Sequence, residues 1–151
     1  RKKVDEQMKI SLLSVMVMLL PVLLLAGIMV VLAVTPGEPV RLITTYGFLV
    51  IFGWITSIIL GMTFKTLPFI VWNKVYHQKA GQGKVPNPKD LFSAGIFNWM
   101  SMFYLIGCLL FTMGILTRYL ALLQTGALIL LLAAVLYNWN VLKLLTHKPV
   151  V

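Results

Sequence analysis

Four long apolar stretches make up most of this 151-residue chain and constrain its fold more than any other feature. They cover about residues 10–34, 42–66, 91–116 and 120–141. A helix needs about 20 mainly apolar residues to cross the hydrocarbon core of a bilayer, and each stretch is long enough. Hydrophobic residues make up 60% of the chain, more than a soluble domain of this size can bury. The sequence therefore predicts an all-α integral membrane protein with four transmembrane helices.

Prolines indicate where these helices bend or end. We expect Pro21 to kink the first span, and the turn at residues 35–39, with two prolines and a glycine, separates it from the second. The second apolar stretch continues to Trp72, which corresponds to about 48 Å of straight helix and exceeds the bilayer core. We expect this helix to leave the hydrocarbon near Lys65, bend at Pro68 and continue as an interfacial helical extension over residues 67–76.

Two connections complete the predicted topology. Residues 73–90 form an extended polar loop rich in glycine, proline and lysine, and Asp90 at its end is a candidate N-cap for the third span. Residues 117–119 are too few to do more than reverse the chain, so the third and fourth spans should form an antiparallel hairpin.

Basic residues gather on one side of the four predicted spans. That side carries ten of them: Arg1, Lys2, Lys3, Lys9, Lys74, Lys79, Lys84, Lys89, Lys143 and Lys148. Arg41 and Arg118 are on the other side. The positive-inside rule then places both termini and the 73–90 loop in the cytoplasm, as for a bacterial inner-membrane protein. We interpret the net charge of +9 as a topology signal that also attracts anionic lipid headgroups, and we expect no nucleic-acid partner.

Small residues recur on the second span and predict a helix-packing face. Gly53, Ser57 and Gly61 are spaced four residues apart, with Gly47 earlier on the same helix. Such spacing lets another helix backbone approach closely, either within this chain or on a larger subunit. Ordinary packing of membrane helices explains the pattern equally well, and Gly107 and Gly114 on the third span form a weaker version of it.

A group of polar residues lies at one predicted depth and is the candidate ligand-binding site. Its members are Lys65, Asn98, Ser101, Tyr104 and Asn138, with Asn140 nearby. Asn98, Ser101 and Tyr104 follow each other at intervals of three residues, which places them on one face of a helix. Together with Lys65 they would suit a quinone or lipid headgroup. The plainer interpretation is a set of hydrogen bonds between helices, with Lys65 extending to the interface.

The residues needed for metal binding or catalysis are sparse. Cys108 is the single cysteine, and His77 and His147 lie outside the four spans. The four acidic residues all lie in tails or loops and cannot form a proton relay across the bilayer. We therefore predict no metal ligands, no catalytic residues and no cofactor bound by this chain.

Residues 46–72 combine a glycine-rich helix with the sequence FKTLPF at 64–69. In this pattern the segment resembles a late helix of the catalytic subunit of haem-copper oxidases and their degenerate, ligand-poor relatives. That family places haem-ligating histidines about one helix length before the proline, where this chain has Thr-Thr-Tyr-Gly-Phe at 44–48. Its polar residue before the proline, histidine in many members, is here Lys65. The resemblance thus implies packing features without a haem site.

Two hypotheses for function follow. The first is a non-catalytic accessory or oxidase-like subunit that packs against a larger respiratory or redox complex, with any haem or quinone held by a partner or by a segment outside this chain. The alternative is a membrane protein that binds a small molecule, a quinone or a lipid, or forms part of a transporter.

Overall fold

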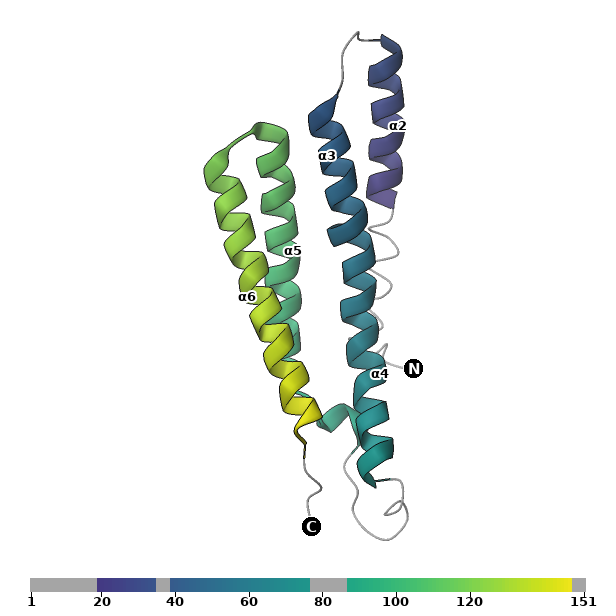
Figure 1. Ribbon diagram of the computed structural model, residues 1–151, viewed down its shortest axis with the longest axis vertical. Coiled ribbons are helices and arrows are strands. Elements are labelled where there is room, and N and C mark those ends of the chain that lie inside the picture. The colour runs from purple at the N-terminus through teal and green to yellow at the C-terminus, as the bar shows by residue number, and fades with distance from the viewer. Residues whose placement is uncertain (1–18, 35–38, 77–86, 148–151) are drawn as a thin grey trace, which may run out of the picture.

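The computed structural model describes residues 19–34, 39–76 and 87–147, and every regular element within these ranges is a helix (Figure 1). In chain order the elements are α2 (Leu19–Val34), α3 (Val40–Phe48), η1 (Leu49–Thr56), α4 (Ser57–Tyr76), η3 (Pro88–Asp90), α5 (Ala94–Thr117) and α6 (Leu120–Leu145). The helices α5 and α6 lie side by side, and the helix formed by α3 and α4 runs along them with α2 against its first half (Figure 1).

Three helices within the described part of the chain are long and apolar enough to cross a membrane. They span Val40–Tyr76, Ala94–Thr117 and Leu120–Leu145, with 37, 24 and 26 residues. The predicted all-helical membrane architecture is confirmed to that extent. The first predicted span lies partly outside the described residues, and its described part, α2, has 16 residues. Pro21 is the third residue of α2, so the kink expected there also falls at the limit of the described part.

The second span and its extension form one continuous helix. At about 1.5 Å per residue its 37 residues measure about 55 Å, well beyond the hydrocarbon core. It runs through Pro68, which lies inside α4 and is buried, and the expected extension over residues 67–76 is helical. Pro68 has no N–H to donate to the helix, yet it does not end it, because helices packed around a proline compensate for the lost bond.

A part of the first half of this long helix is a π-helix, which the sequence pattern did not predict. The segment η1 covers Leu49–Thr56, and in such a turn each N–H bonds to the carbonyl five residues earlier. The Thr56 side chain follows the same spacing, since its Oγ1 donates to the Ile51 carbonyl at 2.8 Å. Wide turns of this kind change the rotation of the helix between its two halves, and they are frequent at functional sites.

The helices α5 and α6 form the expected antiparallel hairpin, and glycines let their backbones approach each other. A Cβ added at Gly126 would lie 2.8 Å from the backbone nitrogen of Phe111. At Gly114 and Gly107 it would lie 2.9 Å and 3.1 Å from backbone nitrogens of α6. These three glycines thus form a close backbone contact, which the sequence indicated weakly for Gly107 and Gly114 and did not indicate for Gly126.

The start of the third span differs from the prediction. Asp90 ends the short helix η3, where its Oδ2 accepts the backbone N–H of Asn87 at 3.3 Å. Ser93 is the N-cap of α5, and its Oγ accepts the N–H of Ile96 at 3.5 Å. As a result, α5 begins at Ala94, three residues later than predicted. Leu91 and Phe92, which lie between Asp90 and the Ser93 cap, are both buried against the core.

The core lies where α4 meets the hairpin. Its largest cluster is formed by Phe64, Phe92, Phe97 and Met100. At the end of the bundle, Tyr76 is buried and its hydroxyl lies 3.0 Å from Nε2 of His147, so His147 connects α6 to α4 and is not a free loop residue. The outward faces of all the long helices expose large apolar side chains, as lipid-facing surfaces do.

Candidate functional site

A cavity of about 310 Å³ lies between η1, α4, α5 and α6, and we call it the inter-helix cavity. Ten residues line it: Phe52, Thr56, Ile59, Leu60, Met100, Tyr104, Leu130, Ala133, Ala134 and Tyr137. Most of the lining is aliphatic or aromatic, and three hydroxyl groups provide its side-chain polarity. A concave, mainly apolar space of this size between packed helices is typical of a small-molecule site.

Tyr104 is the residue that connects the cavity to the π-helix. Its side chain is buried, and its hydroxyl donates a hydrogen bond to the carbonyl of Phe52 in η1. It packs in a cluster with Cys108 on its own helix and Ala133 on α6. This bond joins the middle of α5 to the π-helical segment of the second span.

The three hydroxyl groups of the cavity all donate their protons within the protein. Tyr104 donates to the Phe52 carbonyl, and Thr56 donates to the Ile51 carbonyl. Tyr137 donates to Oγ1 of Thr63 on α4, at 3.5 Å. A hydroxyl has one proton to donate and two lone pairs to accept. The cavity therefore offers a ligand acceptors and apolar contact, but its side-chain donors are already engaged.

Of the five polar residues predicted as a ligand-binding group, Tyr104 is the one that lines this cavity. Lys65 and Asn98 are exposed. Ser101 donates to the Phe97 carbonyl at 2.8 Å, and Asn138 donates to the Ala134 carbonyl at 2.8 Å, each within its own helix. The five therefore do not converge on one cavity, because they point in different directions around their helices.

The predicted helix-packing face is largely buried by the chain itself. Gly53, Ser57 and Gly61 are buried, and the Ser57 hydroxyl donates to the Gly53 carbonyl. Gly47 is half-buried, and a Cβ added there would meet no atom within 4 Å. Three of the four positions thus pack within this protein and are not free to receive another subunit.

Several cavity residues were missed because nothing local distinguishes them. Phe52, Leu60 and Ala133 are apolar residues in apolar spans, and they become lining residues only through the rotation of their helices. Tyr137 carries a readable signal, because it places a hydroxyl group inside a predicted apolar span. Asn140, grouped with the polar residues, is fully buried and bonds to the backbone of Ser93.

Within residues 19–34, 39–76 and 87–147, no group of three histidine, cysteine, aspartate or glutamate side chains is arranged to hold a metal ion. The lining of the inter-helix cavity includes no carboxylate, histidine or lysine that could transfer a proton. The chemistry that the lining does offer is apolar contact and hydroxyl oxygen atoms.

Comparison with protein-family models, with curated proteins and with solved structures finds no match to this chain. The likeness of residues 46–72 to a haem-copper oxidase helix stays a prediction from sequence.

Proposed function

We propose that this protein is a four-span integral protein of a bacterial inner membrane, with both termini cytoplasmic, that binds an apolar chain of the lipid class in the inter-helix cavity. The observation that carries the proposal is the cavity itself, about 310 Å³ of mainly apolar space bordered by three membrane-length helices. Its size lies at the lower end of the range for small-molecule sites, about 300–1,000 Å³.

The hydrogen bonds around the cavity favour a lipid chain over a quinone ring. A quinone presents two carbonyl oxygens, which need donors in a site that excludes water. The hydroxyls of Tyr104 and Thr56 already donate to backbone carbonyls, and that of Tyr137 makes a long 3.5 Å contact with Oγ1 of Thr63. A quinone carbonyl would therefore displace one of the two shorter bonds or depend on Tyr137 alone. An acyl or isoprenoid chain has no such requirement.

Filling the cavity tests the proposal. Ala134 lines it and is partly open to the surface, so Ala134→Phe should insert a ring into the cavity while the helices keep their packing. We expect wild-type protein in detergent to bind the fluorescent fatty acid cis-parinaric acid, and Ala134→Phe to weaken this binding about tenfold or more, the equivalent of ~1.4 kcal/mol. Lys65→Gln, which changes an exposed residue of the predicted polar group, should bind within about twofold of wild type.

Two results would contradict this assignment. Unchanged affinity in Ala134→Phe, with the variant folded by circular dichroism, would show that the chain binds elsewhere. Displacement of cis-parinaric acid by an equal concentration of decylubiquinone would instead assign the cavity to quinone.

A second proposal is the accessory subunit of a larger respiratory or redox complex, favoured by the surface of α6. This helix is the least buried of the three membrane-length helices. In its most apolar 18-residue stretch, 11% of the residues are buried, against 22% and 28% in the other two helices. Asn138 on α6 and Asn98 on α5 also expose amides, which can hydrogen-bond to helices of a partner. Purification in mild detergent should then recover co-migrating redox subunits, with no Soret band once this chain is isolated. Recovery of this chain without any co-migrating protein would contradict this second proposal.

A further inference from the structure

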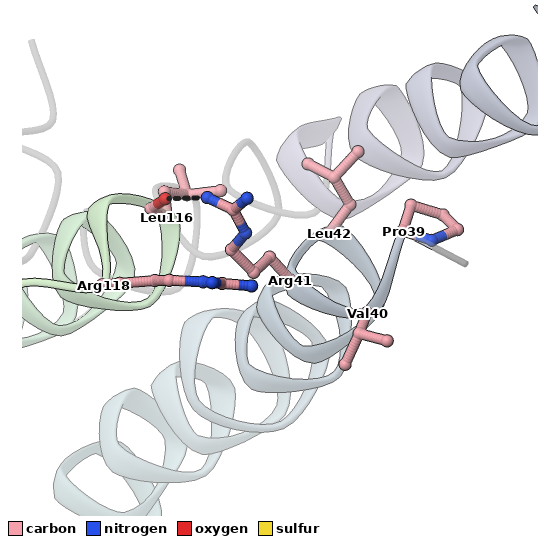
Figure 2. Close-up of a pocket in the computed structure, with 6 residues that line it drawn as sticks. All are labelled: Pro39, Val40, Arg41, Leu42, Leu116 and Arg118. Carbon is pink, nitrogen blue, oxygen red and sulfur yellow. Dashed lines mark hydrogen bonds between the residues drawn. The ribbon is translucent and has the colours of Figure 1, made fainter. Parts of the chain in front are cut away.

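A second cavity, of about 360 Å³, lies at the end of the bundle opposite the C-terminal ends of α4 and α6. It is lined by Pro39, Val40, Arg41, Leu42, Leu116 and Arg118, and we call it the arginine cavity. Figure 2 shows both guanidinium groups in the space between the start of α3 and the end of α5. Along α5, twelve residues or about 18 Å separate Leu116 from Tyr104, so this cavity is distinct from the inter-helix cavity.

The two arginines reach the cavity from different helices by specific backbone geometry. Arg41 is the second residue of α3. Arg118 is the residue after α5, in the left-handed conformation with φ 57°, which turns the chain into the hairpin. The left-handed conformation is unfavourable for residues other than glycine, so this turn places the Arg118 side chain here at the expense of some backbone strain.

Within residues 19–34, 39–76 and 87–147, one hydrogen bond involves the guanidinium groups of these arginines. Nη1 of Arg41 donates to the Leu116 carbonyl at a long 3.4 Å (Figure 2), which leaves most of their N–H groups available to a ligand. Each guanidinium has five N–H donors in a planar fork that matches the oxygens of carboxylate and phosphate. None of the six lining residues is an acid. Two positive groups in one cavity repel each other, and an anion between them would remove that repulsion.

The position of the pair in the membrane indicates which anion. By the predicted topology, Arg41 and Arg118 are the two exceptions among the basic residues, on the side that membrane proteins usually leave poor in positive charge. Both lie at the ends of membrane-length helices, where phospholipid phosphates are found, and the other lining residues are apolar. A soluble anion gains nothing from contact with apolar side chains, whereas a phospholipid can place its glycerol and first methylene groups against them.

We propose that the arginine cavity binds the phosphate of an anionic phospholipid from the leaflet opposite the C-terminal ends of α4 and α6. Arg118 and Arg41 donate to the phosphate oxygens, and Val40, Leu42 and Leu116 contact the start of the acyl chains. This site is independent of the proposed binding of an apolar chain in the inter-helix cavity.

Native mass spectrometry with defined lipids tests the proposal. Delipidated full-length protein is titrated with phosphatidylglycerol, and the first bound lipid is expected to dissociate about tenfold more readily from the double variant Arg41→Gln/Arg118→Gln than from wild type. The matched control is Lys74→Gln/Lys143→Gln, which removes two exposed cations at the opposite end of the bundle. In this control, the affinity for the first bound lipid should stay within about twofold of the wild-type value. Arg118→Lys, which keeps the charge but loses the fork, should give an intermediate loss.

Two further arms identify the source of the anion. Phosphatidylcholine should bind more weakly than phosphatidylglycerol, and inorganic phosphate at millimolar concentration should fail to displace the lipid. Displacement by inorganic phosphate would overturn the lipid assignment in favour of a soluble anion. Equal effects of the arginine and lysine double variants would overturn the site.

Discussion

Replacing Gly126 with alanine is expected to destabilise the protein by about 1–3 kcal/mol, because the new methyl group would overlap the backbone of the neighbouring helix. An added Cβ would lie 2.8 Å from the backbone nitrogen and 3.0 Å from the Cα of Phe111. Backbone atoms in the middle of α5 cannot move aside without separating the two helices. The measurement is the midpoint of unfolding in mixed micelles of increasing sodium dodecyl sulfate content, followed by circular dichroism.

The matched control for this substitution is Gly47→Ala. A Cβ at Gly47 would meet no atom within 4 Å, so alanine fits there without rearrangement. It should leave the protein as stable as wild type, or more stable by up to about 1 kcal/mol from the better helix propensity of alanine. Equal unfolding midpoints for the two alanine variants would contradict the close α5–α6 contact.

Replacing Asn140 with alanine is expected to lower the free energy of unfolding by about 2–3 kcal/mol, because it removes two hydrogen bonds at a fully buried position. The side chain is fully buried, and its Oδ1 accepts the Ser93 N–H while its Nδ2 donates to the Ser93 carbonyl, both at 3.1 Å. These bonds connect α6 to the N-cap of α5. Loss of the amide should therefore also speed hydrogen exchange of the first turn of α5, a local effect that mass spectrometry after proteolysis can measure.

Asn138→Ala provides the control for Asn140→Ala. Asn138 is two residues earlier on the same helix, exposed, and bonded to the carbonyl of Ala134 in its own helix. Its replacement should change the unfolding free energy by less than about 0.5 kcal/mol and leave exchange at the start of α5 unchanged. If both variants lose similar stability, Asn140 does not hold the hairpin in the way the structure indicates.

The predicted polar group shows how far a sequence can lead toward a site. Its members were selected by depth, and depth follows from position along an apolar span, which hydropathy measures well. Direction around the helix axis is a different quantity. The π-helix η1 changes the rotation between α3 and α4, so which residues of the second span face the hairpin could not be derived by counting from Lys65. Tyr104 lines a cavity while Asn98, two turns earlier on α5, is exposed.

The amino-acid sequence by itself determined that the described chain is helical and suited to a membrane, and that α5 and α6 pair. These conclusions depend on composition over about 20 residues and on a connection too short for another path. The tertiary structure alone decided that Gly126 contacts the α5 backbone, that Asn140 holds Ser93, and that Arg41 and Arg118 share a cavity. The physical reason is that crossing a bilayer requires a long apolar segment, which can be recognised from neighbouring residues alone. The rotation of each helix about its axis depends instead on packing between residues far apart in the chain.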